Sequence, residues 1–250
     1  GRGYQTDYIR PANRLRDNIV PSIGVPASDN MFATSILGSN LSPYFAIGRL
    51  TIDRAVQLGI YLNKVKDFDA NSNEIWKKHN LHLAGGEDGS QAINFTNRLN
   101  SHANFVKAQP FGGWVTTYTK SSVGISEPFL KQKAIDVVCK PEGNGVQFVT
   151  FLGHGSANVA DVDIGDTLEY YNKNKYPIFY FNGCSIGNPC IGPPNKNVRL
   201  SGERFINAKD KGAIAFIGQT ALSELNHVDR QNRELYRLIY SSKYNGNYTI

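Results

Sequence analysis

The chain has 250 residues, a formal net charge of +6, an apolar content of 40% and 19% charged residues. That length and composition are typical of a globular protein with one sizeable core or two small ones. No apolar run approaches the roughly 18 residues of a membrane-spanning helix, and the basic residues are too scattered for a nucleic-acid-binding face. Three cysteines are too few for a disulfide framework in a chain of this length.

The order of apolar segments predicts how the chain is organised. Residues 1–43 are rich in Pro, Asn, Gly and Ser, which indicates an extended N-terminal loop segment continuing a preceding subdomain. Residues 44–250 alternate β-branched or aromatic runs with amphipathic segments, which predicts an α/β domain, a three-layer αβα sandwich around a mostly parallel sheet. The expected strands lie at 44–50, 81–84, 114–118, 146–152, 178–182 and 213–217. The expected helices lie at 55–65, 95–106, 127–138, 202–209 and 232–239, with a short one near 167–171.

Two of the expected strands are followed directly by side chains that can take part in catalysis. The run at 146–152 leads into Gly153-His154-Gly155, and the run at 178–182 leads into Gly183-Cys184-Ser185. In a parallel sheet both segments lie at the carboxyl edge, where open α/β sheets place their sites. An imidazole beside a thiol can take its proton and leave a nucleophilic thiolate. The pattern therefore predicts Cys184 as nucleophile and His154 as its base.

Ser185 is an alternative nucleophile, because residues 183–187 also fit the G-x-S-x-G elbow of serine hydrolases. That elbow needs a helix directly after the serine, whereas Gly187-Asn188-Pro189 would interrupt a helix within one turn. It also needs a later histidine, which leaves only His227 in a polar segment. The cysteine is therefore the favoured nucleophile.

The three cysteines allow three further interpretations. A disulfide between Cys184 and Cys190 would consume the expected nucleophile, and a zinc site made of these two and His154 lacks the close paired spacing of structural zinc sites. Most free cysteines are small buried apolar residues. That description suits Cys139 on an apolar helix face better than Cys184 among glycines.

The two strand ends resemble those of the caspase-like clan of cysteine peptidases, and more closely those of the gingipain family, peptidase family C25. Segments 46–65 and 76–89 are also similar to the family, so the resemblance spans about residues 28–240. It implies a caspase-like catalytic domain, a cysteine-type peptidase, and Glu87 as the acid that orients His154. Without the resemblance, Glu87 reads as an ordinary carboxylate in a glycine-rich loop.

Within the family, residues 202–224 resemble the PorU type of sortase from the type IX secretion system. This implies an exported enzyme at the bacterial cell surface or outer membrane, which removes C-terminal signals from exported cargo. The implied partners are polypeptide substrates and other secretion-system outer-membrane proteins, with no nucleic acid. No cofactor is required for this chemistry, and the sequence does not determine whether a structural calcium ion binds.

The expected mechanism is attack of the Cys184 thiolate on a peptide carbonyl, with backbone N–H groups of Gly155 and Cys184 holding the oxyanion. Gly183, Gln219 and Thr220 are the expected substrate-binding residues. The acyl-enzyme then passes to water or to an amine, and the sequence does not choose between these acceptors. The alternative from another class is a scaffold subunit of the secretion machinery that has the fold without catalysis.

The ends of the chain also lead to an expectation. Residues 1–43 supply little apolar cover for the predicted sheet, and residues 244–250 read as the middle of a connection. We therefore expect these 250 residues to be a piece of a larger exported protein, with an exposed apolar strip beside the sheet.

Overall fold

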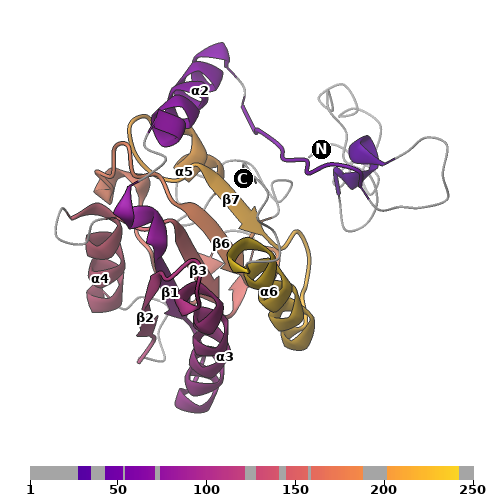
Figure 1. Cartoon of the computed structure of the whole chain (residues 1–250), viewed down its shortest axis with the longest axis vertical. Helices are drawn as coiled ribbons and strands as arrows, with labels where there is room; N and C mark the ends of the chain where they lie inside the picture. The colour runs from indigo at the N-terminus through magenta and orange to yellow at the C-terminus, as the bar shows by residue number, and fades with distance from the viewer. Residues whose placement is uncertain are drawn as a thin grey trace.

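The computed structural model describes residues 28–34, 43–52, 54–70, 74–121, 128–140, 145–156, 159–187 and 202–241. Its centre is a parallel five-stranded sheet in the order β2-β1-β3-β6-β7 (Figure 1). The strands are β1 His79–Ala84, β2 Trp114–Thr119, β3 Phe148–Leu152, β6 Ile178–Asn182 and β7 Ala215–Gly218. A short antiparallel ribbon, β4 Gly155–Ser156 and β5 Val159–Ala160, follows β3.

Helices cover both faces of this sheet. They are α2 Ala55–Ala70, α3 Gly89–Lys107, α4 Pro128–Cys139, α5 Gly202–Asn207 and α6 Leu225–Tyr240, with short 3-10 turns at Asn30–Ala33, Ile75–Lys78 and Thr167–Glu169. Helices α4 and α5 pack on one face, and α3 and α6 pack on the other (Figure 1). The predicted α/β fold, with a mostly parallel sheet flanked by helices, is confirmed.

The two central strands are buried along their whole length, which explains why they read as unbroken apolar runs. Side chains alternate between the faces: Val149 and Phe151 of β3 join the core under α4 and α5, whereas Phe148 packs against α6. Burial of each such side chain stabilises the fold by about 1.5–3 kcal/mol. This core fixes the positions of the two strand ends that carry the candidate site.

The predicted strand at 44–50 is wrong. The structure gives these residues no strand pairing, and the side chains of Tyr44 and Phe45 are 74% and 61% exposed. The segment runs as an extended connection into α2 (Figure 1). Aromatic and β-branched content reports how well a segment fits a pleated, half-buried surface, and no strand among the described residues pairs with this segment to supply that surface.

Several predictions of boundaries differ from the structure or lie outside its described residues. Strand β1 begins at His79, two residues before the predicted start, because polar side chains pair there with neighbouring segments. Helix α3 begins at Gly89, six residues before the first apolar position used to predict it. The N-terminal segment is described only at 28–34 and from 43 onward, and Cys190 and residues 242–250 lie outside the described residues.

A buried lysine joins α2 to the end of α5. The Lys64 Nζ donates hydrogen bonds to the carbonyl oxygens of Phe205 at 3.0 Å, Ile206 at 3.0 Å and Ala213 at 2.7 Å. Burial lowers the pKa of Lys64 to about 7. The side chain thus satisfies carbonyl groups at the C-terminal end of α5 that have no partner within that helix.

Replacement of this lysine should destabilise the protein strongly. Lys64→Met keeps an apolar stem but removes the Nζ donor from three carbonyl oxygens, of which that of Phe205 still accepts from the Ala213 N–H at 3.1 Å. We therefore expect the free energy of unfolding to fall by about 3 kcal/mol. Urea unfolding followed by circular dichroism measures the change. The matched control is Lys66→Met on the exposed side of α2. Its free energy of unfolding should stay within about 0.5 kcal/mol of that of the unaltered chain. Equal effects from the two substitutions would contradict this role of Lys64.

Candidate active site

The carboxyl ends of β3 and β6 bring the two predicted catalytic segments together. Leu152 and Asn182 are paired in register at the ends of these neighbouring strands, and the Gly153 N–H donates to the Asn182 carbonyl oxygen at 3.1 Å. His154 and Cys184 follow two residues after the paired positions. Beyond them the two segments stay in close contact: a Cβ added at Gly183 would lie 3.2 Å from the Gly155 Cα.

The thiol of Cys184 is half-buried and turned toward the segment that follows β7. Its Sγ lies 3.6 Å from the carbonyl oxygen of Ser223 and 3.9 Å from the Ser223 Oγ. Two backbone hydrogen bonds fix these segments together: the Ser185 N–H donates to Ala221 O at 2.8 Å, and the Gly187 N–H donates to Gln219 O at 2.9 Å. The Cys184 N–H makes no hydrogen bond within the described residues.

Ser185 has a left-handed backbone conformation, with φ of 55°. Residues 184–187 form a turn rather than the start of a helix, so the described part of this segment lacks the helix that a nucleophile elbow requires directly after its serine. The N–H of Ser185 is already used in the bond to Ala221. The geometry at Ser185 therefore gives no support to the serine alternative.

The imidazole of His154 is exposed but is contacted on two sides by α3. Its Nε2 lies 2.8 Å from the Gln91 Oε1, and its ring packs edge-on against Phe95, with ring centroids 5.8 Å apart. The carbonyl oxygen of His154 accepts a hydrogen bond from the Asp161 N–H at 3.0 Å. Within the described residues, His154 and Cys184 do not hydrogen-bond to each other.

The carboxylate of Glu87, the predicted orienting acid, makes no hydrogen bond to His154 in the described part of the chain. The side chain is exposed, and in the described part of the chain it makes no hydrogen bond. Its backbone N–H donates to the Gln91 Oε1 at 3.3 Å, so Gln91 stands between Glu87 and His154. The role of Glu87 as the orienting acid stays a prediction.

Sequence reasoning missed Gln91, although one signal was present. Asp88 caps α3, and its Oδ1 accepts from the Gln91 N–H at 2.8 Å. An Asp followed three residues later by Gln is the pattern of a capping box, which would have placed the start of α3 and Gln91 with it. The contact from Gln91 to His154 joins residues 63 apart and has no local signature.

A second missed residue is Asp161, which joins the loop after β1 to the loop after β3. Its buried carboxylate accepts from the Gly86 N–H at 2.7 Å, and burial raises the pKa of Asp161. Its other oxygen has no hydrogen-bond partner within the described residues and lies against Gly85 and Gly153, where an added Cβ would collide with it. Glycine at these two positions therefore allows the carboxylate to fit between the loops.

The predicted substrate-binding residues lie next to the nucleophile segment. Gly183 is buried beside Gly155, while Gln219 and Thr220 are half-buried at the start of the segment that runs beside residues 184–187. The Gln219 side chain donates to Gln231 on α6 at 3.0 Å. In the same segment Leu222, next in sequence to the Ser223 that contacts the thiol, is 86% exposed.

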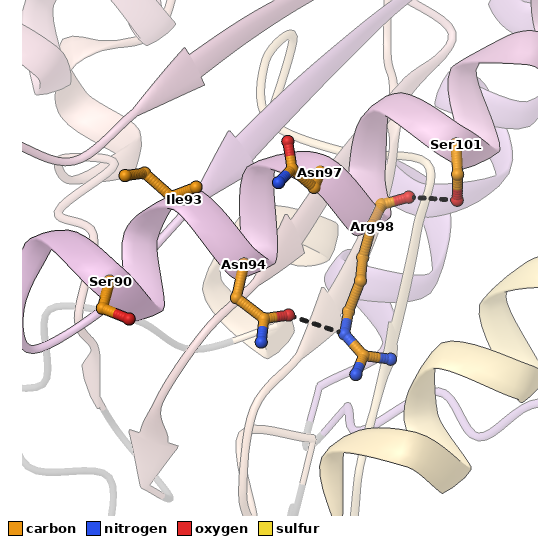
Figure 2. Close-up of a pocket in the computed structure, with 6 residues that line it drawn as sticks. All are labelled: Ser90, Ile93, Asn94, Asn97, Arg98 and Ser101. Carbon is orange, nitrogen blue, oxygen red and sulfur yellow. Dashed lines mark hydrogen bonds between the residues drawn. The ribbon is translucent and has the colours of Figure 1, made fainter.

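Other kinds of site receive no support from the described residues. No group of three His, Cys, Asp or Glu side chains there could hold a metal ion, and no described helix is long and apolar enough to cross a bilayer. A surface depression lies along the exposed face of α3 and involves residues other than the predicted catalytic ones (Figure 2). It is lined by Ser90, Ile93, Asn94, Asn97, Arg98 and Ser101.

Comparison with known proteins gives one solved structure and one family. A structure described as "Structure of Protease" superposes with a TM-score of 0.61 at 19% sequence identity, covering 85% of this chain and 42% of that chain. This chain thus corresponds to less than half of that protein, and at this identity the likeness concerns the fold. No curated protein matches. The family model "Peptidase family C25" matches residues 3–250, and the chain therefore belongs to peptidase family C25, the gingipain family.

Proposed function

We propose that this chain is the catalytic part of a cysteine peptidase in which Cys184 is the nucleophile and His154 the general base. The observation that carries the proposal is the register of β3 and β6, which brings the two residues to adjacent strand ends in a chain of this family. Open α/β sheets place reactive groups at such an edge.

The chemistry begins with transfer of the Cys184 proton to the imidazole of His154. The thiolate attacks the peptide carbonyl carbon, and the developing oxyanion accepts hydrogen bonds from backbone N–H groups of Gly155 and Cys184, each contributing about 3 kcal/mol. The imidazolium then returns its proton to the leaving amine as the C–N bond breaks, which leaves a thioester on Cys184. Water or an acceptor amine attacks the thioester and regenerates the thiol.

In the structure the thiol contacts Ser223 rather than His154, so the first step requires rotation of the Cys184 side chain away from the Ser223 carbonyl oxygen. Catalytic hydrogen bonds that are loose in a free enzyme commonly tighten when substrate binds. A bound peptide that takes the place of the contact with Ser223 would bring the thiol and the imidazole together.

The finer proposal concerns the substrate. The resemblance of residues 202–224 to the PorU-type sortases supports cleavage of C-terminal signals from exported proteins in type IX secretion, at the cell surface or outer membrane. These residues include α5, β7 and the segment at 219–223 that lies beside the nucleophile. In such an enzyme the thioester passes to an amine of the surface lipopolysaccharide rather than to water.

The test is covalent trapping with a peptidyl chloromethyl ketone at neutral pH, followed by peptide mapping. We expect labelling at Cys184, because a partly exposed thiol assisted by an imidazole reacts readily. Burial raises the pKa of Cys139 to about 11, so that thiol should remain unlabelled. Peptides ending in a cargo C-terminal signal should protect Cys184, and scrambled peptides of the same composition should not.

Two outcomes would contradict the proposals separately. A lack of selective labelling at Cys184 would favour the non-catalytic scaffold instead of a peptidase. Selective labelling without protection by the cargo peptides would keep the peptidase and remove the sortase assignment.

A further inference from the structure

We propose that Gln91 is the positioning residue for His154, and that it fixes the imidazole as the tautomer with hydrogen on Nε2. The remaining nitrogen, Nδ1, is then the one that accepts the proton of Cys184. This inference rests on the proposed peptidase function for its consequence, but the contact itself can be tested without turnover.

The backbone N–H of Glu87 shows which atom of the Gln91 amide faces the His154 ring. The Gln91 Oε1 lies 2.8 Å from the His154 Nε2 and 3.3 Å from the backbone N of Glu87. A backbone N–H can only donate, so the amide atom that faces it must be the carbonyl oxygen rather than the NH2 group. An amide oxygen only accepts, so the His154 Nε2 must carry the hydrogen. In a neutral imidazole this leaves the lone pair on Nδ1.

Contacts within and beside α3 fix the positions of Gln91 and of the imidazole that it binds. It is in the first turn of α3, where its own N–H donates to the capping Asp88 Oδ1 at 2.8 Å. Phe95, one helical turn later on the same face, contacts the imidazole edge-on. The carbonyl oxygen of His154 is bound by the Asp161 N–H. The ring is thus fixed by a side chain, an aromatic contact and its own backbone.

The acceptor is neutral, which distinguishes it from a carboxylate. The charged groups around this corner are Glu87 and Asp88 on the preceding loop, the buried Asp161, and Lys120, whose Nζ donates to the Gly86 carbonyl oxygen at 3.0 Å. None of these side chains hydrogen-bonds to the imidazole within the described residues. Gln91 therefore orients His154 without adding a negative charge that would favour the imidazolium form.

The experiment uses the full chain with 15N-labelled histidine and follows the ring nitrogens by NMR, with His154 assigned by loss of its signals in His154→Gln. In the unaltered chain we expect the Nε2–H tautomer to dominate. Gln91→Leu removes the acceptor, so both tautomers should appear. Cys184 labelling should slow about tenfold, an effect of the size seen when hydrogen-bonded partners of metal-bound histidines are removed. Gln91→Glu keeps an acceptor oxygen at this position and should therefore retain the Nε2–H tautomer.

The matched control is Asn97→Leu, on the exposed face of the same helix (Figure 2). It introduces the same side chain and should change neither the tautomer nor the labelling rate. The proposal is overturned if Gln91→Leu leaves the tautomer unchanged, or if Glu87→Gln produces the loss of tautomer instead. If the unaltered chain shows no labelling at all, the peptidase proposal fails, and the tautomer measurement still decides the role of Gln91.

Discussion

Cys184→Ala should lower peptide cleavage by about 10³-fold or more, because it removes the atom that forms the thioester in the proposed mechanism. The fold should be unaffected, since the half-buried thiol has hydrogen-bond partners only at Ser223 among the described residues. The measurement is kcat/KM on a fluorogenic peptide together with a thermal unfolding curve for each protein.

The neighbouring hydroxyl provides the control for this prediction. Ser185→Ala keeps the backbone bond to Ala221 and should change cleavage little, because the hydroxyl has no step in the mechanism. Full activity of Cys184→Ala, or a large loss in Ser185→Ala with Cys184→Ala active, would return the nucleophile to the serine alternative.

The second large effect is loss of stability in acid, caused by a buried histidine. His82 on β1 lies with its Nε2 2.8 Å from the Tyr236 hydroxyl, which is itself 2.6 Å from the Thr150 Oγ1. Burial lowers the pKa of His82 to about 3, and the nearby His102 and Lys107 act in the same direction. The folded protein therefore keeps this imidazole neutral where the unfolded chain protonates it.

The direction of this change in stability follows from proton binding in the folded and unfolded states. Between pH 6.5 and about pH 3 the unfolded state binds a proton at His82 that the folded state does not, so the free energy of unfolding falls as pH falls. The loss from this residue should reach about 4 kcal/mol across that window. His102, whose pKa burial also lowers, adds to the loss in the same direction.

Urea unfolding at a series of pH values from 8 to 4 measures this dependence. His82→Gln removes the titrating group, so its free energy of unfolding should fall less steeply below pH 6.5. His227→Gln, at an exposed position on α6, should keep the steep slope of the unaltered chain. A slope that His82→Gln leaves unchanged would mean that other groups cause the acid sensitivity.

The sequence was sufficient for the parts of the fold that local patterns determine. The strands β3 and β6 are unbroken runs of β-branched and aromatic residues because both faces of each strand are covered, and their glycine-bounded ends placed His154 and Cys184 together. The same rule, that a run of β-branched and aromatic residues predicts a strand, failed at 44–50, which pairs with no strand among the described residues. Pairing depends on what lies beside a segment, and composition does not contain that information.

The residues that surround His154 could not be predicted for a related reason. Gln91 and Asp161 reach their partners across 63 and 75 positions of the chain. Such contacts follow from how α3 and the ribbon after β3 pack on the finished sheet. The resemblance to the family offered Glu87 for the same corner, and only the geometry shows that Gln91 is the residue in contact.

The carboxylate of Asp161 has a consequence for movement around the site. The Asp161 side chain accepts a hydrogen bond from the Gly86 N–H and fills the space between Gly85 and Gly153. The Asp161 N–H donates to the carbonyl oxygen of His154. One residue thus couples two loops that come from different strands. A peptide that displaces the loop after β1 would displace the histidine segment with it, so adjustment to substrate on this side would be a shared rigid-body motion.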